Sequence, residues 1–159
     1  MNITFQGNKI TLIGKTLNIG DCLEDFKVVD NNLNEVSLKD LPGKKVFLTV
    51  PSLDTPVCDL EVRTFNNKVG KLDYNVYAIS MDLPFAQSRW CGAKGVNNVS
   101  TLSDYKNHSF SKVTGTYIEE LGLLTRSVIV VDENNKVTYI EYVKEVTNEP
   151  DYDECLKKL

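Results

Sequence analysis

The sequence predicts an α/β fold in which helices flank a central mixed sheet, with a β-hairpin at the N-terminus. Strand-like apolar segments at residues 46–50 and 75–81 enclose a helix-like segment at 58–69. A strand, a helix and a strand within about forty residues form a right-handed crossover with two parallel strands. Further along, an unbroken apolar run at 127–131 is followed by a turn and a strand at 137–143, which indicates an antiparallel hairpin.

The segments before the crossover read as two pairs of short strands. Residues 2–5 and 9–13 alternate in polarity around Gly7-Asn8, which is a two-residue hairpin signal. A second pair, 26–29 and 35–38, encloses a turn rich in aspartate and asparagine. We therefore expect a hairpin to open the chain and a second strand pair to follow it.

The segments after the crossover are shorter. Pro84 can open a helix that runs to about residue 93, because proline is tolerated at the first helical position. Residues 99–102 form a short apolar segment, 118–121 a short expected helix, and 152–158 a closing helix. A parallel unit followed by an antiparallel hairpin and a terminal helix is the element order of thioredoxin-like folds.

Length and charge limit the possible classes of protein. A chain of 159 residues is expected to form one domain over residues 1–159, with about two-thirds of its unfolded surface buried. The net charge of −4 and the lack of any lysine or arginine cluster argue against nucleic acid or an anionic membrane as partner. Neither a signal peptide nor an apolar run of about 18 residues is found, so we expect a cytoplasmic protein.

The four cysteines are expected to be free or catalytic thiols, because no signal peptide directs the chain to an oxidising compartment. With no C-x-x-C motif and a single histidine, His108, a zinc site is not expected. Cys22, in the loop before a strand, and Cys155, on the closing helix at a core spacing, belong to no motif. We expect both to be inert.

Cys58 is the candidate nucleophile because it lies on the turn between the strand 46–50 and the following helix. A cysteine there points its sulfur at the free N–H groups of the helix, where the positive end of the helix dipole stabilises a thiolate. Thr55 stands where a C-x-x-C motif has its first cysteine, and its hydroxyl can donate to a thiolate or to an incoming oxygen. This arrangement favours attack on a small electrophile over disulfide exchange.

The run Pro51-x-x-x-Thr55-x-x-Cys58 resembles the active-site motif of the peroxiredoxins. Residues 82–91, with the sequence Asp-Leu-Pro-Phe-Ala-Gln-Ser-Arg-Trp-Cys, and the opening hairpin at 5–8 resemble the thiol peroxidases, the atypical two-cysteine peroxiredoxins. The similarity extends over nearly the whole chain, and three separated motifs occur in the right order. The resemblance implies a thioredoxin-like fold and a homodimer.

The same resemblance implies a reaction cycle. A Cys58 thiolate attacks the terminal oxygen of a hydroperoxide and becomes a sulfenic acid. Cys91, which taken alone resembles an apolar filler, matches the resolving cysteine and closes an intramolecular disulfide that a thioredoxin-like reductant reopens. Thr55 and Arg126 hold the peroxide oxygens, while Pro51 shields the thiolate from water. No metal, flavin or nucleotide cofactor is needed.

Arg126 directly precedes the buried strand 127–131, where an unpaired guanidinium would be costly, so it requires a nearby anion. Sequence alone favours an ordinary surface arginine at a strand entrance. The resemblance instead places it at the Cys58 sulfur. Asp59 and Glu61 raise the cost of a neighbouring thiolate, and Arg126 is our candidate for the compensating cation.

Two other functions are compatible with parts of this pattern. A redox sensor or adaptor would use the same Cys58–Cys91 switch to alter a partner, and the sequence does not separate it from an enzyme because the sulfur chemistry is shared. A Cys–His hydrolase would require His108 as base. That residue lies in a polar, loop-like stretch at 104–109, and Cys58 lacks the flanking signature of a cysteine protease.

Overall fold

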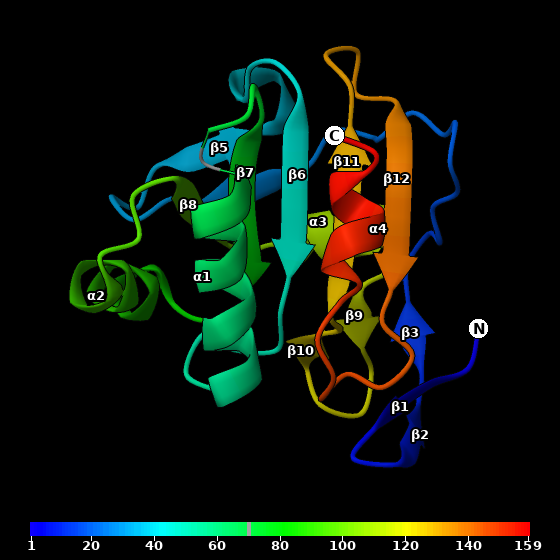
Figure 1. Ribbon diagram of the computed structural model, residues 1–159. Helices are drawn as coiled ribbons and strands as arrows, with labels where there is room; N and C mark the ends of the chain where they lie inside the picture. Colours follow the sequence, from blue (N-terminus) through cyan, green and yellow to red (C-terminus); the bar gives the residue numbers. More distant parts are fainter. Residues whose placement is uncertain (70) are drawn as a thin grey trace.

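The computed structural model describes residues 1–69 and 71–159, and a seven-stranded mixed sheet forms its centre (Figure 1). The strand order is β12-β11-β6-β7-β8-β4-β5. The strands of this sheet are β4 (Lys27–Val29), β5 (Glu35–Ser37), β6 (Lys45–Thr49), β7 (Asn75–Ser80), β8 (Val99–Ser103), β11 (Ser127–Val131) and β12 (Val137–Tyr142). The helices are α1 (Pro56–Val69), α2 (Pro84–Lys94), α3 (Ser109–Thr114) and α4 (Tyr152–Leu156), with a 3-10 turn at Leu38–Asp40.

The predicted crossover is the central unit of the sheet. β6, β7 and β8 run parallel, and β11 pairs antiparallel with β6 on one side and with β12 on the other. Every residue of β6 and β11 is buried, as expected for strands covered on both faces. The predicted fold class, a thioredoxin-like mixed sheet with flanking helices, is confirmed.

Helices cover both faces of the sheet. In Figure 1, α1 lies over β7 and β8, and α4 lies over β11 and beside β12 on the same face, with α3 behind the sheet. Apolar side chains of α1 and α4 share one core cluster with one face of the strands, and Phe110 of α3 belongs to the cluster on the other face. α2 packs beside β8, at the edge of the molecule in Figure 1.

The N-terminal hairpin is present, but its turn lies one residue earlier than predicted. β1 (Ile3–Phe5) and β2 (Asn8–Ile10) pair through a turn at Gln6 and Gly7, whose φ angles of 51° and 79° are both positive, as a type I′ turn requires. The expected second strand at 9–13 is divided, because β3 (Leu12–Ile13) leaves the hairpin and pairs with β9 (Tyr117–Ile118).

The expected helix at residues 118–121 was wrong. The chain forms β9, a turn, and β10 (Leu123–Leu124), which together with β3 make a three-stranded sheet. Gly122 permits this turn with a φ of +66°, and its N–H donates to the Ile118 carbonyl at 2.9 Å. A four-residue helix gains few hydrogen bonds for the cost of its nucleation, whereas pairing with β3 and β10 satisfies the backbone groups of β9.

The remaining boundaries differ in ways that matter for the site. α1 begins at Pro56, two residues before the predicted start, so Cys58 lies inside its first turn. The short apolar segment at 99–102 is the parallel strand β8, and α4 ends at Leu156, before the expected 158. α3 was not predicted. None of the helices among the described residues is long and apolar enough to cross a membrane.

Candidate active site

The start of α1 determines the position of the Cys58 sulfur. Cys58 is the third residue of the helix and is 0% exposed. The Asp59 N–H donates to the Thr55 carbonyl at 3.0 Å, so Thr55 is the residue that caps the helix. The first-turn N–H groups lack intrahelical acceptors and carry the positive end of the helix dipole. The sulfur is therefore held in an electropositive position that is closed to solvent.

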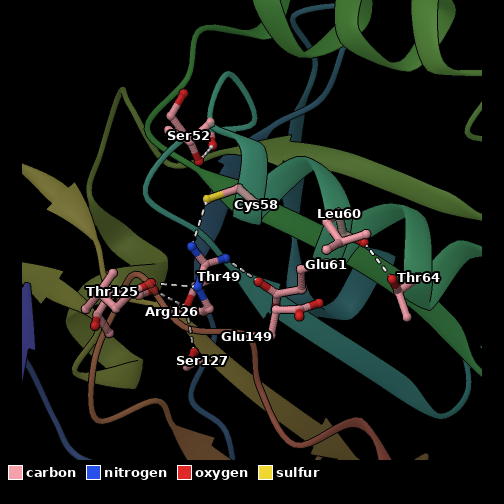
Figure 2. Close-up of polar contacts among 12 residues, drawn as sticks. Thr49, Ser52, Cys58, Leu60, Glu61, Thr64, Thr125, Arg126, Ser127 and Glu149 are labelled. Carbon is pink, nitrogen blue, oxygen red and sulfur yellow. Dashed lines mark hydrogen bonds and ion pairs between the residues drawn. The ribbon is translucent and has the colours of Figure 1, made fainter. Parts of the chain in front are cut away.

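Arg126 reaches this sulfur from the start of β11 (Figure 2). Its Nη2 donates to Cys58 Sγ at 3.1 Å, its Nη1 donates to Glu61 Oε2 at 2.5 Å, and its Nε donates to the Val146 carbonyl at 2.8 Å. Only 2% of Arg126 is exposed. Three partners on one planar group fix its orientation. The contact between the Arg126 guanidinium and the Cys58 sulfur, which the resemblance to the peroxiredoxins implies, is present.

Glu61 completes the buried ion pair, whereas the sequence pointed to it only as a negative charge that Arg126 compensates. It lies three residues after Cys58 on α1, so the two side chains share one face of the helix. Burial raises the pKa of the Glu61 carboxyl to about 7, although Arg126 opposes the rise, and Glu141 and Glu149 add to it. Within the described part of the chain, Glu61 Oε1 has no hydrogen-bond partner.

Arg126 stays charged in this environment. Burial by itself lowers the pKa of the guanidinium, but the Glu61 carboxylate and the Cys58 sulfur outweigh that effect, and the pKa is raised overall. The strand ends that carry it are tied together, since Thr49 Oγ1 donates to the Thr125 carbonyl at 2.7 Å and lies 2.5 Å from Ser127 Oγ. Arg126 is thus a fixed, permanent cation.

The loop before α1 is anchored to the segment that precedes α2. Asp82 accepts from Ser52 Oγ at 2.7 Å and from the Leu53 N–H at 2.8 Å. Pro51 is buried at the base of this loop. The Thr55 hydroxyl donates to the Ser52 carbonyl at 3.0 Å, so its proton is used inside the loop in this conformation. The roles of Thr55 and Pro51 toward a bound peroxide stay predictions.

Cys91 lies within α2, three residues before its last residue, Lys94, which is close to the expected end at about residue 93. It is half-buried, and its Sγ is 3.5 Å from Thr101 Oγ1 on β8. Cys58 and Cys91 are both free thiols, each on an intact helix. The structure does not bond the proposed disulfide partners to one another, and Cys91 contacts the strand β8 instead.

The other singled-out residues have separate surroundings. Cys22 is exposed. Burial, and to a smaller extent the negative charge of Glu141, raise the pKa of the Cys155 thiol to about 12, so this thiol stays protonated. His108 immediately precedes α3, and its ring centroid is 5.4 Å from that of Tyr117. These contacts give no support to a Cys–His pair.

Comparisons with known proteins agree with this geometry. The family model described as Redoxin matches residues 18–156. A thiol peroxidase of Clostridium acetobutylicum is 56% identical and covers 99% of this chain and 96% of its own length. A thiol peroxidase of Bacillus subtilis is 54% identical, with 98% of this chain and 94% of that protein covered. The crystal structure of a peroxiredoxin-like protein from Aquifex aeolicus superposes with a TM-score of 0.89 at 38% identity, and covers 99% of this chain and 94% of that chain.

A thioredoxin-like sheet that presents a buried cysteine at a helix start, beside a buried arginine, defines a thiol-dependent oxidoreductase of the Redoxin type. The chain belongs to the Redoxin family and, within it, to the thiol peroxidases of the peroxiredoxin group.

Proposed function

We propose that this thiol peroxidase reduces hydrogen peroxide and organic hydroperoxides through a Cys58 sulfenic acid and an intramolecular Cys58–Cys91 disulfide, which a thioredoxin-like reductant reopens. The observation that carries the proposal is the 3.1 Å contact from Arg126 Nη2 to Cys58 Sγ at the start of α1. A fixed cation and a helix N-terminus at one buried sulfur are the conditions under which a thiolate forms.

The first step is oxygen transfer. The Cys58 thiolate attacks the terminal oxygen of the hydroperoxide, an S–O bond forms, and the O–O bond breaks. The leaving hydroxide or alkoxide takes a proton and departs as water or an alcohol, and Cys58 becomes a sulfenic acid. Negative charge moves from sulfur to the leaving oxygen, and the Arg126 guanidinium lies close enough to stabilise it without reorganisation.

The second step regenerates the thiol. The Cys91 sulfur attacks the Cys58 sulfur, an S–S bond forms, and the S–O bond breaks. The hydroxide takes the proton from Cys91 and leaves as water. A dithiol reductant then attacks the disulfide, passes through a mixed disulfide, and becomes oxidised while Cys58 and Cys91 are reduced. We expect this step to open α1 and α2 locally, because Cys58 Sγ is buried against Arg126 and Cys91 Sγ faces Thr101 on β8.

Peroxide consumption by cysteine variants tests the proposal. Wild type with thioredoxin and thioredoxin reductase should consume peroxide continuously, Cys58→Ser should consume none, and Cys91→Ser should reduce one equivalent and then stop. Cys22→Ser is the matched control, because Cys22 is exposed and outside the site. Most of the turnover remaining in Cys58→Ser would overturn the assignment. A single stoichiometric burst from wild type would instead favour the redox sensor.

A further inference from the structure

The residues next to the two cysteines are hydrogen-bonded to each other. Asp59 follows Cys58 on α1, and Trp90 precedes Cys91 on α2. Trp90 Nε1 donates to Asp59 Oδ1 at 2.9 Å. The Asp59 side chain is only 16% exposed, and the half-buried Trp90 packs against the core cluster that contains Cys58. This contact joins the two cysteine-bearing helices at the point where they must later separate.

Helix geometry links this contact to the orientation of Cys91. Adjacent residues on an α-helix point about 100° apart, so a helix that places Trp90 on Asp59 turns Cys91 to a different side. Cys91 accordingly lies 3.5 Å from Thr101 Oγ1, beside a cavity of about 360 Å³. The Thr101 hydroxyl donates its proton to Asn31 Oδ1 at 2.9 Å. Because the Thr101 proton is used toward Asn31, the Cys91 S–H is left to donate to Thr101 Oγ1, and this contact directs the sulfur toward β8.

We propose that the Asp59–Trp90 hydrogen bond is a latch that holds Cys91 away from Cys58, and that its opening limits the rate of disulfide formation. The inference rests on the proposed Cys58–Cys91 cycle. A disulfide requires Cα atoms within about 7 Å, so α2 must turn or unwind near Cys91 before the bridge forms. Either movement takes Trp90 from the carboxylate. Asp59 and Trp90 are positioning residues, since neither is required to touch the peroxide.

The latch decides between two fates of the sulfenic acid. Cys91 can attack the Cys58 sulfur and release water. Alternatively, a second hydroperoxide molecule can transfer another oxygen to that sulfur, which gives a sulfinic acid and releases water or an alcohol. A latch that opens slowly prolongs the lifetime of the sulfenic acid and increases the share lost to the second reaction.

The Trp90→Phe variant tests the latch, because it keeps an apolar aromatic ring and removes the N–H donor. We expect disulfide formation after a peroxide pulse to be about tenfold faster than in wild type, on the order of one charge-assisted hydrogen bond. The sulfinic fraction at a given peroxide excess should fall severalfold. Rapid acid quenching followed by mass spectrometry measures the disulfide and the sulfinic acid in the same samples.

The chain offers a matched control on the same carboxylate. Arg63 donates to Asp59 Oδ2 at 2.8 and 3.1 Å, but it lies on α1 with Asp59 and so joins no second helix. Arg63→Gln should therefore leave the rate of disulfide formation unchanged. Asp59→Asn keeps an acceptor oxygen for Trp90, but it loses the charge and with it the ion pair from Lys94 Nζ of α2 to Asp59 Oδ1 at 3.8 Å, so it should also accelerate disulfide formation.

Two results would overturn the latch. One is an unchanged rate of disulfide formation in Trp90→Phe and Asp59→Asn while wild type forms the disulfide normally. The other is an equal acceleration in Arg63→Gln, because that would show a general loosening of α1. If circular dichroism shows Trp90→Phe unfolded, the comparison of Asp59→Asn with Arg63→Gln decides alone. A wild type that forms no disulfide after reducing one equivalent of peroxide would refute the proposed function itself.

Discussion

Replacing Arg126 with methionine should destabilise the folded protein more at alkaline pH than at acidic pH. The reason is Glu61, which is 0% exposed and forms an ion pair with Arg126. Burial raises the pKa of Glu61 from its ordinary 4.5 to about 7, and Arg126 opposes this rise. Without Arg126 the opposition disappears, so the pKa of Glu61 in the variant should lie above 7.

The sign and size of this pH-dependent destabilisation follow from proton linkage. A carboxyl whose pKa is raised on folding contributes stability that is fully present below its unfolded pKa and is lost as the pH rises through its folded pKa. In wild type this loss ends near the folded pKa of about 7. In the variant it continues at about 1.4 kcal/mol per pH unit up to the folded pKa of Glu61 in the variant, which gives up to about 2 kcal/mol of extra destabilisation at about pH 8.5.

Other lost contacts contribute at every pH. The Arg126 Nε–H bond to the Val146 carbonyl is lost, and that acceptor is left without its donor. Breaking a buried ion pair by removing one partner costs about 3–5 kcal/mol in total, so the pH-dependent share is about half. For a domain of this size the extra 2 kcal/mol corresponds to about 4–8 °C in Tm.

Urea denaturation of wild type and Arg126→Met at about pH 6 and about pH 8.5 measures both components. The double variant Arg126→Met/Glu61→Gln is the control, because it removes the titrating carboxyl and should show no extra loss at the higher pH. Equal destabilisation of Arg126→Met at the two pH values would refute the assignment of a buried, titrating Glu61.

The remaining predictions concern the charge, the loop and the thiols. Arg126→Lys keeps the charge and loses the planar fork, so its single-turnover rate of peroxide reduction should fall by a factor on the order of 10²; an unchanged rate would contradict the role of the fork. Asp82→Asn removes the carboxylate that accepts from the loop at 51–55, and should lower the thermal midpoint by about 2–4 °C per kcal/mol lost. Thiol labelling of the folded protein should modify the exposed Cys22 rapidly and the buried Cys155 only after unfolding. Equal labelling rates for the two thiols would contradict the burial of Cys155. Amide exchange should be faster in the first turn of α1 than in β11, since that turn lacks backbone acceptors.

The central crossover was predictable because its signals are long and agree with one another. β6 is an unbroken apolar run, and α1 begins with Pro56 and follows a turn-rich loop. The short elements were not predictable in the same way. β9 and β10 have two residues each, and their strand character comes from pairing with β3, which lies more than a hundred residues away in sequence. No local pattern encodes such a pairing.

The candidate site shows the same division. Cys58 was named from its position at a helix start. Arg126 was named from the resemblance to the peroxiredoxins, since its position before a buried strand alone favoured a surface arginine. The structure brings the two residues into contact. Glu61 was recognised only as a charge to be balanced. Its three-residue spacing from Cys58 was available in the sequence. Its complete burial depends on tertiary contacts, which are the ion pair with Arg126 and the packing of α1 against α4 through Phe65 and Tyr152. The contact between Trp90 and Asp59 joins two helices, and the residue spacing within either helix does not predict it.

The contacts around Cys58 divide into a fixed group and a movable group. Arg126 is held by Val146 and Glu61 at the start of a fully buried central strand, so moving it would break the core. The helix turn that carries Cys58 is held instead by contacts of Asp59 and Asp82 with neighbouring segments, and its first N–H groups have no backbone acceptors to lose. Opening this turn therefore costs far less than displacing the arginine. In the proposed cycle Cys58 leaves Arg126 after oxidation, and this direction of motion matches the proposed step in which Cys58 reaches Cys91.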